Sequence, residues 1–378
     1  MRIGIDARWI FKEFSGIGLY TQELIRGLVR LASGHELILF FNDPALRDRT
    51  WRQAEISDRS HVRAEMIPWG VFSMPSQLFL PGRIRKLGLD IFHSPNYMLP
   101  FAAFSRRRPH RTRGVITIHD LIPLLFPQFT PKALKTRFYP VYRRVMKEAG
   151  TRADMMLTVS ETSRRDIIQH LNVPDSRVVA IPNGVAQEYQ PATPAKSGPK
   201  TILYVGRFDP YKNVLGLLEA FRLVRERARQ EVRLRLVGAP DPRYPEAPRR
   251  ARELGVAEAV EWTGYAAGPE LVSAYQSADV FVLLSYYEGF GLTLLEAMAC
   301  GTPVVCSRIG AIQEVAGDAA LLVPPDRPAE AASAILKLLT EPDHAADLRR
   351  KGLARAAEFS WWKTAERTLK AYEQTLNT

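Results

Sequence analysis

The chain has 378 residues, enough for two domains of ordinary size, because single globular cores stop growing at roughly 250 to 300 residues. Hydrophobic residues make up 46% and charged residues 24%, and no apolar run reaches the roughly 18 residues that a membrane-spanning helix needs. The N-terminus reads as a strand rather than a signal peptide, and the two cysteines, Cys300 and Cys306, favour a reducing cytoplasm over a disulfide or zinc framework.

The net charge of +12 lies entirely in the first half of the sequence. Residues 1–185 hold 28 Lys and Arg against 16 Asp and Glu, whereas residues 186–378 hold 24 against 24. A one-sided positive field predicts an anionic partner, either a lipid bilayer or a polyanion. Nucleic acid is the rival polyanion, but the sequence carries no helix-turn-helix, zinc or aromatic-platform pattern, so we expect no nucleic-acid partner.

The first half alternates short apolar runs with helical patterns. A helix is expected at 19–31, and strands are expected at 2–6, 35–42, 90–93, 114–119 and 155–159. Strands separated by helices indicate a parallel sheet that is covered on both faces. The Pro-, Ala- and Thr-rich stretch 190–200 is typical of a linker between domains.

A second series of strands follows this linker. They are expected at 201–205, 234–237, 259–263, 280–284 and 303–306, with helices at 329–339 and 364–376. The sequence therefore predicts an α/β protein with two doubly wound, Rossmann-like domains at 1–185 and 186–358, and a C-terminal segment at 359–378. Because ligands bind at the carboxyl ends of such strands, we expect a site in a cleft between the halves.

A short glycine pattern opens the first predicted helix. Ser15, Gly16 and Gly18 precede the helix at Leu19, and such a loop offers backbone N–H groups to a phosphate. A dinucleotide-binding fingerprint would need a further glycine where Thr21 stands, with an acidic residue about 20 positions later. Neither is evident, so the sequence disfavours a nicotinamide cofactor.

Two histidines stand at the ends of predicted strands, where ligand-facing residues collect. His119 and Asp120 follow the apolar run 114–118, and His93 occupies a similar place in FHSPNY. A histidine at such a position can donate to a sugar hydroxyl, while Asp120 can cap a helix or fix the histidine tautomer. The alternative is a hydrogen-bonded structural histidine, and His93 fits that alternative at least as well.

Two cations follow the first strand of the second series. Arg207 comes directly after Gly206 in GRFDPYKN, and Lys212 precedes a helical pattern. A guanidinium fork and a point charge at a strand end suit a diphosphate. The alternative is that both are solvated residues of a turn, which is the commoner fate of Arg and Lys.

The segment EGFGLTLLE is the most informative stretch. It follows an apolar run at 279–285 and places Glu288 in a loop and Glu296 about two turns into the next helix. Gly289 and Gly291 allow backbone N–H groups to approach an anion where that helix begins. Read alone, Glu288 is equally well a surface carboxylate, and Glu296 a charge favoured by the helix dipole.

The stretch 126–147 interleaves aromatic and aliphatic residues with six Lys and Arg. An amphipathic, basic and aromatic helix is typical of binding to a membrane surface. A helix that packs on the core and keeps a solvated basic face is the alternative. The stretch lies in the positive half of the chain, which favours an anionic membrane surface as its partner.

Together, EGFGLTLLE, GRFDPYKN and the IHD at residues 118–120 resemble the retaining glycosyltransferases of family four, which have the GT-B fold and include sucrose synthases and many bacterial mannosyltransferases. The resemblance covers nearly the whole chain. It implies that two Rossmann-like domains face a central cleft and that the C-terminal helix returns to the N-terminal domain. No Asp-x-Asp triplet occurs, so we expect no metal and no cofactor beyond the nucleotide-sugar donor.

The resemblance also implies a role for each candidate residue. Glu288 would position the donor sugar, with His119 close to it, and Glu296 would contact the donor ribose. Arg207 and Lys212 would neutralise the departing diphosphate. The residues expected to contact the rest of the nucleotide, largely through backbone groups, are Gly16, Gly18, Gly264, Tyr265, Phe290, Gly291 and Leu292.

The passages SGIGLYTQEL, DIFHSPNYMLP and TIHDLIPLLFP look most like bacterial mannosyltransferases of polysaccharide and O-antigen assembly. They imply transfer of mannose from GDP-mannose, with retention, to a lipid-linked or polysaccharide acceptor at the cytoplasmic face of the cell membrane. UDP-glucose is the alternative donor. A nonenzymatic scaffold that binds polyanions is the alternative of a different class.

Overall fold

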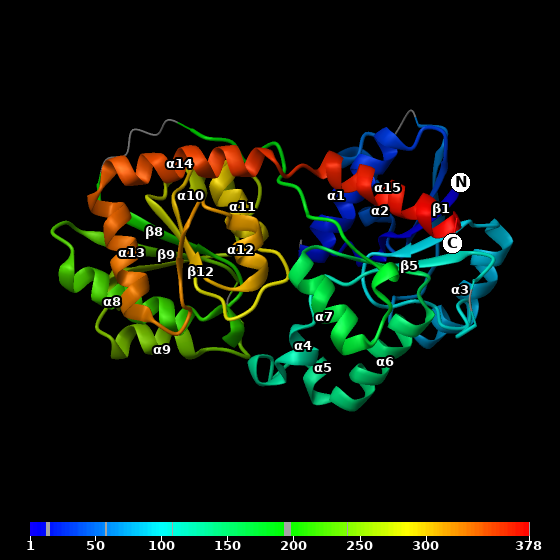
Figure 1. The fold of residues 1–378 in the computed structure, drawn as a ribbon, viewed down its shortest axis with the longest axis horizontal. Helices are drawn as coiled ribbons and strands as arrows, with labels where there is room; N and C mark the ends of the chain where they lie inside the picture. Colours follow the sequence, from blue (N-terminus) through cyan, green and yellow to red (C-terminus); the bar gives the residue numbers. More distant parts are fainter. Residues whose placement is uncertain (13–15, 57–58, 108, 193–197, 240, 378) are drawn as a thin grey trace. The chain divides into compact units, whose positions relative to one another are not determined.

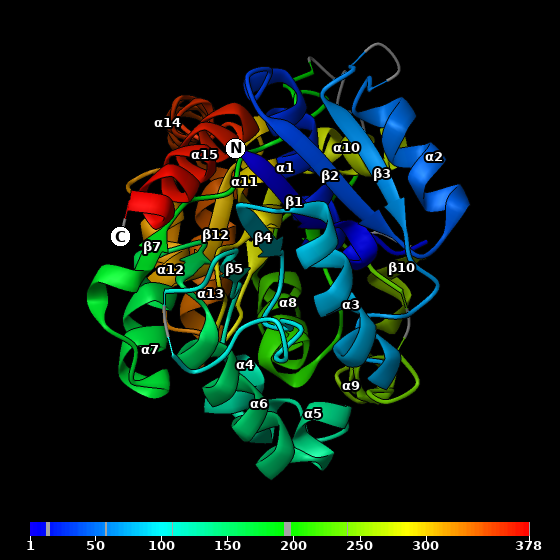
Figure 2. The same ribbon diagram turned by 90° about the vertical axis from the view of Figure 1, so that its right-hand side faces the viewer.

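The computed structural model describes residues 1–12, 16–56, 59–107, 109–192, 198–239 and 241–377. The chain divides into two compact units, and it passes between them four times. Unit 1 comprises Met1–Leu124, Phe138–Gly184 and Ser360–Thr378, and unit 2 comprises Leu125–Arg137 and Val185–Phe359. Figures 1 and 2 show the ribbon coloured along the sequence.

Unit 1 is built on a seven-stranded parallel sheet with the order β3-β2-β1-β4-β5-β6-β7. The strands are β1 Arg2–Asp6, β2 Glu36–Phe41, β3 Val62–Met66, β4 Ile91–Ser94, β5 Arg113–Thr117, β6 Met155–Thr158 and β7 Val178–Ala180. The helices are α1 Gly16–Leu31, α2 Pro44–Gln53, α3 Met74–Leu87, α4 Ile122–Leu125, which ends in unit 2, α6 Tyr139–Arg152, α7 Glu161–Leu171 and α15 Trp361–Asn377. The central strands are fully buried, as expected for a sheet covered on both faces.

The C-terminal helix α15 packs against α1, and both views show the two side by side (Figures 1 and 2). A Cβ added to Gly27 of α1 would lie 2.5 Å from the Cβ of Ala365, so the helices approach closely where the glycine lacks a side chain. At the start of α15, a Cβ on Gly184 would lie 2.0 Å from the backbone nitrogen of Trp361. The C-terminal segment is therefore an integral part of unit 1.

Unit 2 is built on a six-stranded parallel sheet with the order β10-β9-β8-β11-β12-β13. The strands are β8 Lys200–Val205, β9 Val232–Val237, β10 Val260–Gly264, β11 Val280–Leu283, β12 Val304–Ser307 and β13 Leu321–Val323. The helices are α5 Leu134–Arg137, α8 Val214–Arg227, α9 Glu246–Glu253, α10 Pro269–Ser277, α11 Leu292–Ala299, α12 Gly310–Ala316, α13 Pro328–Thr340 and α14 Pro342–Ala357. In Figure 1, α10, α11 and α14 lie above this sheet and α8 and α9 below it.

The stretch 126–147 is not the single amphipathic helix that its composition suggests. It contains a short 3-10 turn at Pro127–Phe129, then α5 and most of α6. Proline removes a backbone donor and clashes with the preceding turn, and this stretch contains three, Pro127, Pro131 and Pro140. Its two parts also belong to different units, because residues 125–137 pack in unit 2 and α6 packs in unit 1.

Candidate active site

The centre of the candidate site in unit 2 is an ion pair between Lys212 and Glu288. Lys212 ends a 3-10 turn at Pro210–Lys212 after β8, and Glu288 follows β11. The Lys212 Nζ lies 2.7 Å from Glu288 Oε1, and the two side chains are only 16% and 10% exposed. The Ser285 hydroxyl donates to the same Oε1 over 2.6 Å. The glutamate is thus held by two donors from different loops.

The electrostatics of this pair keep the lysine charged. Burial lowers the pKa of Lys212. The nearby Glu288 carboxylate and its hydrogen bond raise this pKa and outweigh the effect of burial, so the net pKa lies well above the usual value. The Tyr286 backbone N–H donates to the Tyr211 carbonyl over 2.8 Å, which ties the two loops together beside the pair. The sequence placed both charges at strand ends but did not predict that they neutralise each other.

Arg207 stands in a different setting from Lys212. Its Nε and Nη2 both lie 2.6 Å from Asp209 Oδ2. Asp209 is buried, whereas the Arg207 side chain is 64% exposed, so the carboxylate orients a guanidinium whose remaining donors face solvent. The buried Tyr204 hydroxyl also donates to the Arg207 carbonyl, which fixes the backbone of this turn.

The charges of Lys212 and Arg207 both affect the pKa of the Tyr211 hydroxyl. Burial raises the pKa of its hydroxyl to about 12, and the charges of Lys212 and Arg207 both oppose that increase. The two cations therefore act on the same side chain but differ in their surroundings. The charge of Lys212 is balanced by Glu288, whereas the Arg207 guanidinium is largely exposed to solvent.

Glu296 lies in α11 within a separate and more buried network. The Tyr275 hydroxyl donates to its Oε2 over 2.7 Å, and the carboxylate also bonds with Tyr189. Burial raises the pKa of Glu296 to about 7, because the bond from Tyr275 only partly offsets desolvation and the negative charge of Glu188 raises it further. The two glutamates of EGFGLTLLE therefore have different partners: Lys212 and Ser285 bind Glu288, whereas tyrosines bind Glu296.

The loop between the glutamates is shaped by Gly291. Its φ of +103° favours glycine, and a Cβ there would lie 2.7 Å from Ile312 Cδ1. Among the described residues no side chain caps α11, so the backbone N–H of Leu292 at its start suits an anion. The Phe290 ring is buried edge-on against Phe359, so only its backbone suits a ligand.

The ends of β8, β9 and β10 lie close together at three glycines, Gly206, Gly238 and Gly264. The Gly238 N–H donates to the Gly264 carbonyl over 2.7 Å, and a Cβ on Gly238 would lie 2.0 Å from the Gly206 oxygen. Gly264 has a φ of +77°. The next residue, Tyr265, is 50% exposed and so offers a ring for stacking.

In unit 1, Gly16 begins α1 and is exposed, and a Cβ there would meet no atom of the described residues within 4 Å. Steric fit therefore does not explain this glycine, and its open surroundings suit an approaching ligand. Gly18, two positions further, is buried. Ser15, the first residue of the predicted loop, lies outside the described residues.

His119 is held in one tautomer by the backbone. Its Nε2 lies 3.0 Å from the Pro95 carbonyl, which accepts only, so Nε2 carries the proton. The Tyr20 ring meets the imidazole edge-on with centroids 4.8 Å apart. Asp120 accepts from the Ile122 N–H and so caps α4, while Pro95 fixes the tautomer.

His93 is a structural residue. It is fully buried, with Nδ1 2.7 Å from the Tyr372 hydroxyl and Nε2 2.8 Å from the Thr117 hydroxyl. Burial, helped by His119, lowers the pKa of His93 to about 3, so the ring stays neutral. The Thr117 hydroxyl also lies 3.1 Å from that of Tyr20, so a continuous polar chain links α15 to α1.

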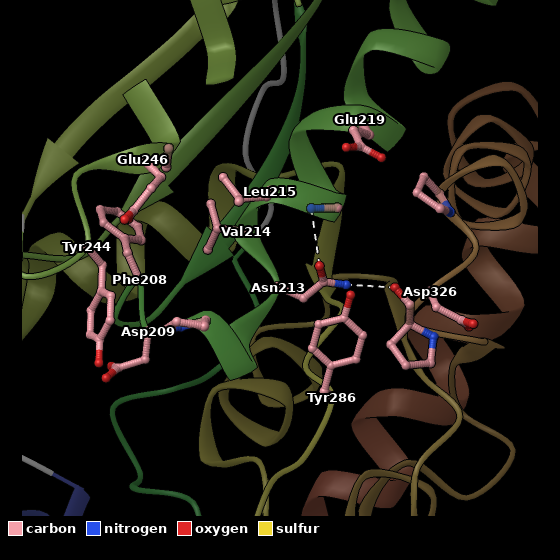
Figure 3. A pocket seen from close by; sticks show the side chains of 15 residues that line it. Phe208, Asp209, Asn213, Val214, Leu215, Glu219, Tyr244, Glu246, Tyr286 and Asp326 are labelled. Atoms are coloured by element: carbon pink, nitrogen blue, oxygen red, sulfur yellow. Dashed lines mark hydrogen bonds between the residues drawn. The ribbon is translucent and has the colours of Figure 1, made fainter. Parts of the chain in front are cut away.

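A pocket of about 350 Å³ adjoins the turn that carries Lys212. Asp209, Tyr286 and Asp326 are among its lining residues, whereas Arg207, Lys212 and Glu288 are not. Figure 3 shows Asn213 at its centre, with Nδ2 donating to the Pro325 carbonyl over 2.7 Å and Oδ1 accepting from the Gly216 N–H. Asn213 was missed from the sequence, although an Asn directly before an apolar helical pattern is an N-cap signal.

Within the described residues, no group of three or more His, Cys, Asp or Glu is arranged to hold a metal ion. None of their helices is both long and apolar enough to cross a membrane.

The two parallel-sheet units define the GT-B class of glycosyltransferases. The fold is similar to that of sucrose-phosphate synthase from Thermosynechococcus elongatus, with a TM-score of 0.74, 24% identity and coverage of 99% of this chain and 98% of that one. It is also similar to HepE from Anabaena in complex with UDP-glucose, with a TM-score of 0.76, 17% identity and 99% coverage of both chains. The predicted fold class is thereby confirmed.

The chain belongs to glycosyltransferase family 4. Residues 14–189 match the family described as Glycosyltransferase Family 4, and residues 185–355 match Glycosyl transferases group 1. O-antigen chain mannosyltransferase B of Escherichia coli is 31% identical over 95% of this chain and 96% of that protein. MMP alpha-(1->4)-mannosyltransferase of Mycolicibacterium hassiacum is 32% identical over 100% of this chain and 98% of that protein. The resemblance to bacterial mannosyltransferases is confirmed.

Proposed function

We propose that this glycosyltransferase transfers mannose from GDP-mannose to a lipid-linked or polysaccharide acceptor, with retention at the anomeric carbon. The observation that carries the proposal is the exposed Arg207 guanidinium beside the Lys212–Glu288 pair at the strand ends of unit 2. This is the charge arrangement that a departing diphosphate requires. The choice of mannose is supported by the two mannosyltransferases to which the chain is similar over nearly its full length.

Each residue has a role in this proposal. Arg207 binds the diphosphate through its exposed donors, and the free N–H groups at the start of α11 bind it through the backbone. Lys212 fixes Glu288, which positions the donor sugar. Glu296 contacts the ribose, while Gly264 and Tyr265 contact the base. Gly16 and Gly18 in α1 and His119 after β5 are the contributions of unit 1.

The reaction breaks the bond between the anomeric carbon and the diphosphate oxygen and forms a bond from the same face to the acceptor oxygen. The electron pair of the broken bond goes to the diphosphate, whose charge Arg207 and Lys212 stabilise. The acceptor proton passes to a phosphate oxygen of the donor. Glu288 is engaged by two donors, which suits a positioning role better than nucleophilic attack. We propose that no metal takes part.

The donor is tested by hydrolysis without acceptor over a panel of nucleotide sugars. The proposal predicts release of GDP from GDP-mannose in excess of every other donor. Preferential release of UDP from UDP-glucose would show that UDP-glucose, the alternative donor, is the substrate. No hydrolysis of any donor, together with tight binding of polyanions, would favour a nonenzymatic scaffold. For an active enzyme, the anomeric configuration of the product, read by NMR, tests retention.

We further propose that unit 1 binds an anionic membrane surface from the cytoplasmic side. The N-terminal part of α3 and the residues before it expose four large apolar side chains, each 56–69% exposed: Phe72, Met74, Leu78 and Phe79. In α6, the exposed residues Arg143, Arg144 and Lys147 line a groove of about 390 Å³. Apolar insertion together with basic residues is the pattern of interfacial binding.

Liposome flotation tests this binding. The wild type should float with anionic vesicles and remain in solution with neutral ones, and replacing both Phe72 and Phe79 by Ser should reduce the floated fraction several-fold. An R143A/R144A variant should lose the preference for anionic lipid. Equal recovery on neutral and anionic vesicles would contradict the proposal.

A further inference from the structure

A segment from the first half of the sequence belongs to unit 2. The chain leaves unit 1 after Leu124 and returns to it at Phe138, and residues 125–137 form part of unit 2. We call this segment the clasp. Only six residues separate His119 from Phe126. The clasp therefore begins shortly after the strand end that carries the active-site histidine of unit 1.

The clasp binds the loop that carries Glu288. Phe129 stacks on Tyr286 with ring centroids 5.2 Å apart and planes only 10° apart. Phe126 packs on Tyr287 with centroids 5.1 Å apart. The two phenylalanines also contact each other, with centroids 5.7 Å apart. Two consecutive tyrosines, directly before the glutamate, are thus covered by two rings of one segment.

A second contact anchors the clasp further along. The Lys132 ammonium donates to the Arg243 carbonyl and lies 5.6 Å from the centroid of the Tyr244 ring. It is also 4.0 Å from a carboxylate oxygen of Glu246. Lys132 is therefore engaged within unit 2, which explains why the clasp keeps its place although the chain on both sides of it belongs to unit 1.

Other contacts also hold the loop near the glutamate. The Tyr286 backbone is tied to Tyr211, and the Glu288 carboxylate is tied to Lys212 and Ser285. The rings of Tyr286 and Tyr287 are only half-buried, and the clasp supplies their aromatic partners. Removal of that cover takes a stacking partner from each tyrosine and so loosens the backbone that sets the direction of Glu288.

We propose that Phe126 and Phe129 are positioning residues: they hold the Tyr286–Tyr287 loop so that Glu288 stays on Lys212 and faces the donor sugar. The role of Glu288 rests on the proposed function, whereas the hold on the loop does not. A positioning effect lowers the rate of the bound complex more than it weakens nucleotide binding, because Phe126 and Phe129 pack on the tyrosines before Glu288, whereas Asp209 orients Arg207.

The test compares F126A/F129A with F126Y/F129Y, which keeps the stacking rings, and with Trp362→Ala, which removes a half-exposed aromatic residue of unit 1. Hydrogen exchange is measured for the backbone amides of residues 286–290. Turnover is measured with the donor that the wild type hydrolyses fastest. The alanine pair should raise amide exchange about tenfold and lower kcat about 10- to 100-fold, with KM and the Kd for the free nucleoside diphosphate changed less than about threefold. Both other variants should behave as wild type.

Unchanged exchange in the alanine pair overturns the proposal, and so does faster exchange with unchanged kcat. A parallel loss in the tyrosine pair also overturns it, because the stacking rings would then be irrelevant. If the wild type hydrolyses no nucleotide sugar, the proposed function fails, and the exchange measurement alone decides whether the clasp holds the loop. A far-UV circular dichroism melt of each variant identifies a variant that is unfolded. If F126A/F129A is unfolded, the single variant F129A gives the decisive values.

Discussion

The strand ends of the two units carry polar groups of opposite character. In unit 1, His93 is locked into a buried chain of neutral partners that runs from Tyr372 to Tyr20. In unit 2, Lys212 and Glu288 form a shielded ion pair, and Arg207 stands exposed beside it. The comparison shows that the charged groups at the strand ends are held in place in unit 2. Unit 2 holds two fixed cations at its strand ends, whereas the buried network of unit 1 stabilises its own fold.

The largest expected effect comes from breaking the ion pair. Lys212→Ala leaves the Glu288 carboxylate without its cation in a site that is 10% exposed, so we expect a loss of about 3 kcal/mol in the free energy of unfolding and at least about a 100-fold loss of turnover. The matched control is Lys200→Ala, whose 3.2 Å pair with Asp279 is 36% exposed on the lysine side and should cost about 1 kcal/mol at most. If urea titrations give equal losses of unfolding free energy for Lys212→Ala and Lys200→Ala, the buried pair is no more stabilising than the exposed one.

The next effect is a pH dependence that belongs to Glu296. Its pKa of about 7 in the folded protein lies above the ordinary value of 4.5. Between these values the folded state keeps a proton that the unfolded chain releases, so stability falls as pH rises. Relative to Glu296→Gln, the wild type should lose roughly 3 kcal/mol between pH 4 and pH 8. Thermal melts across this range measure the stability difference between the wild type and Glu296→Gln. A difference that does not change with pH would contradict the raised pKa of the buried Glu296.

Two glycines of unit 2 give a smaller and graded effect. Both have positive φ, but a Cβ on Gly291 meets Ile312 at 2.7 Å, whereas a Cβ on Gly264 meets nothing within 4 Å. Gly291→Ala should therefore cost about 2 kcal/mol or more, and Gly264→Ala about 1 kcal/mol. Chemical denaturation of both variants measures these values. A larger loss in Gly264→Ala would show that the steric argument is wrong.

The smallest effect lies in the neutral chain of unit 1. Tyr372→Phe removes the hydroxyl beside His93 Nδ1 and leaves a buried polar atom without that partner, so we expect a loss of about 1 to 2 kcal/mol. Tyr265→Phe, at an exposed ring, should change stability by less than about 0.5 kcal/mol. If Tyr372→Phe proves as neutral as Tyr265→Phe, the buried chain does not stabilise unit 1 as its geometry indicates.

Much of this architecture was predictable from the sequence. The alternation of apolar runs and helical patterns gave the parallel sheets, and the resemblance gave the GT-B class. The strands β7 and β13 were missed because three residues carry little periodicity. The strand β3 was also missed, although its apolar and charged residues alternate. The helix expected from Leu19 begins three residues earlier, at Gly16.

The sequence predicted which residues form the candidate site, but not which of their side chains bind each other. Glycines and charges at strand ends are local signals, so Arg207, Lys212, Glu288 and Gly291 were found. The bond from Lys212 to Glu288 spans 76 positions and depends on the neighbouring strands β8 and β11, which no local pattern reveals. The clasp was assigned to an amphipathic helix for the same reason, because the tyrosines that cover its phenylalanines lie far along the chain.

The central claim is that cationic side chains of unit 2, without a divalent ion, stabilise the departing diphosphate. The most direct measurement is donor turnover by wild type and Arg207→Ala, each with and without an excess of chelator. We predict that chelator leaves the wild type unchanged and that Arg207→Ala loses at least about 100-fold in kcat in either condition. Loss of wild-type turnover on chelation, or normal turnover by Arg207→Ala, would contradict the claim.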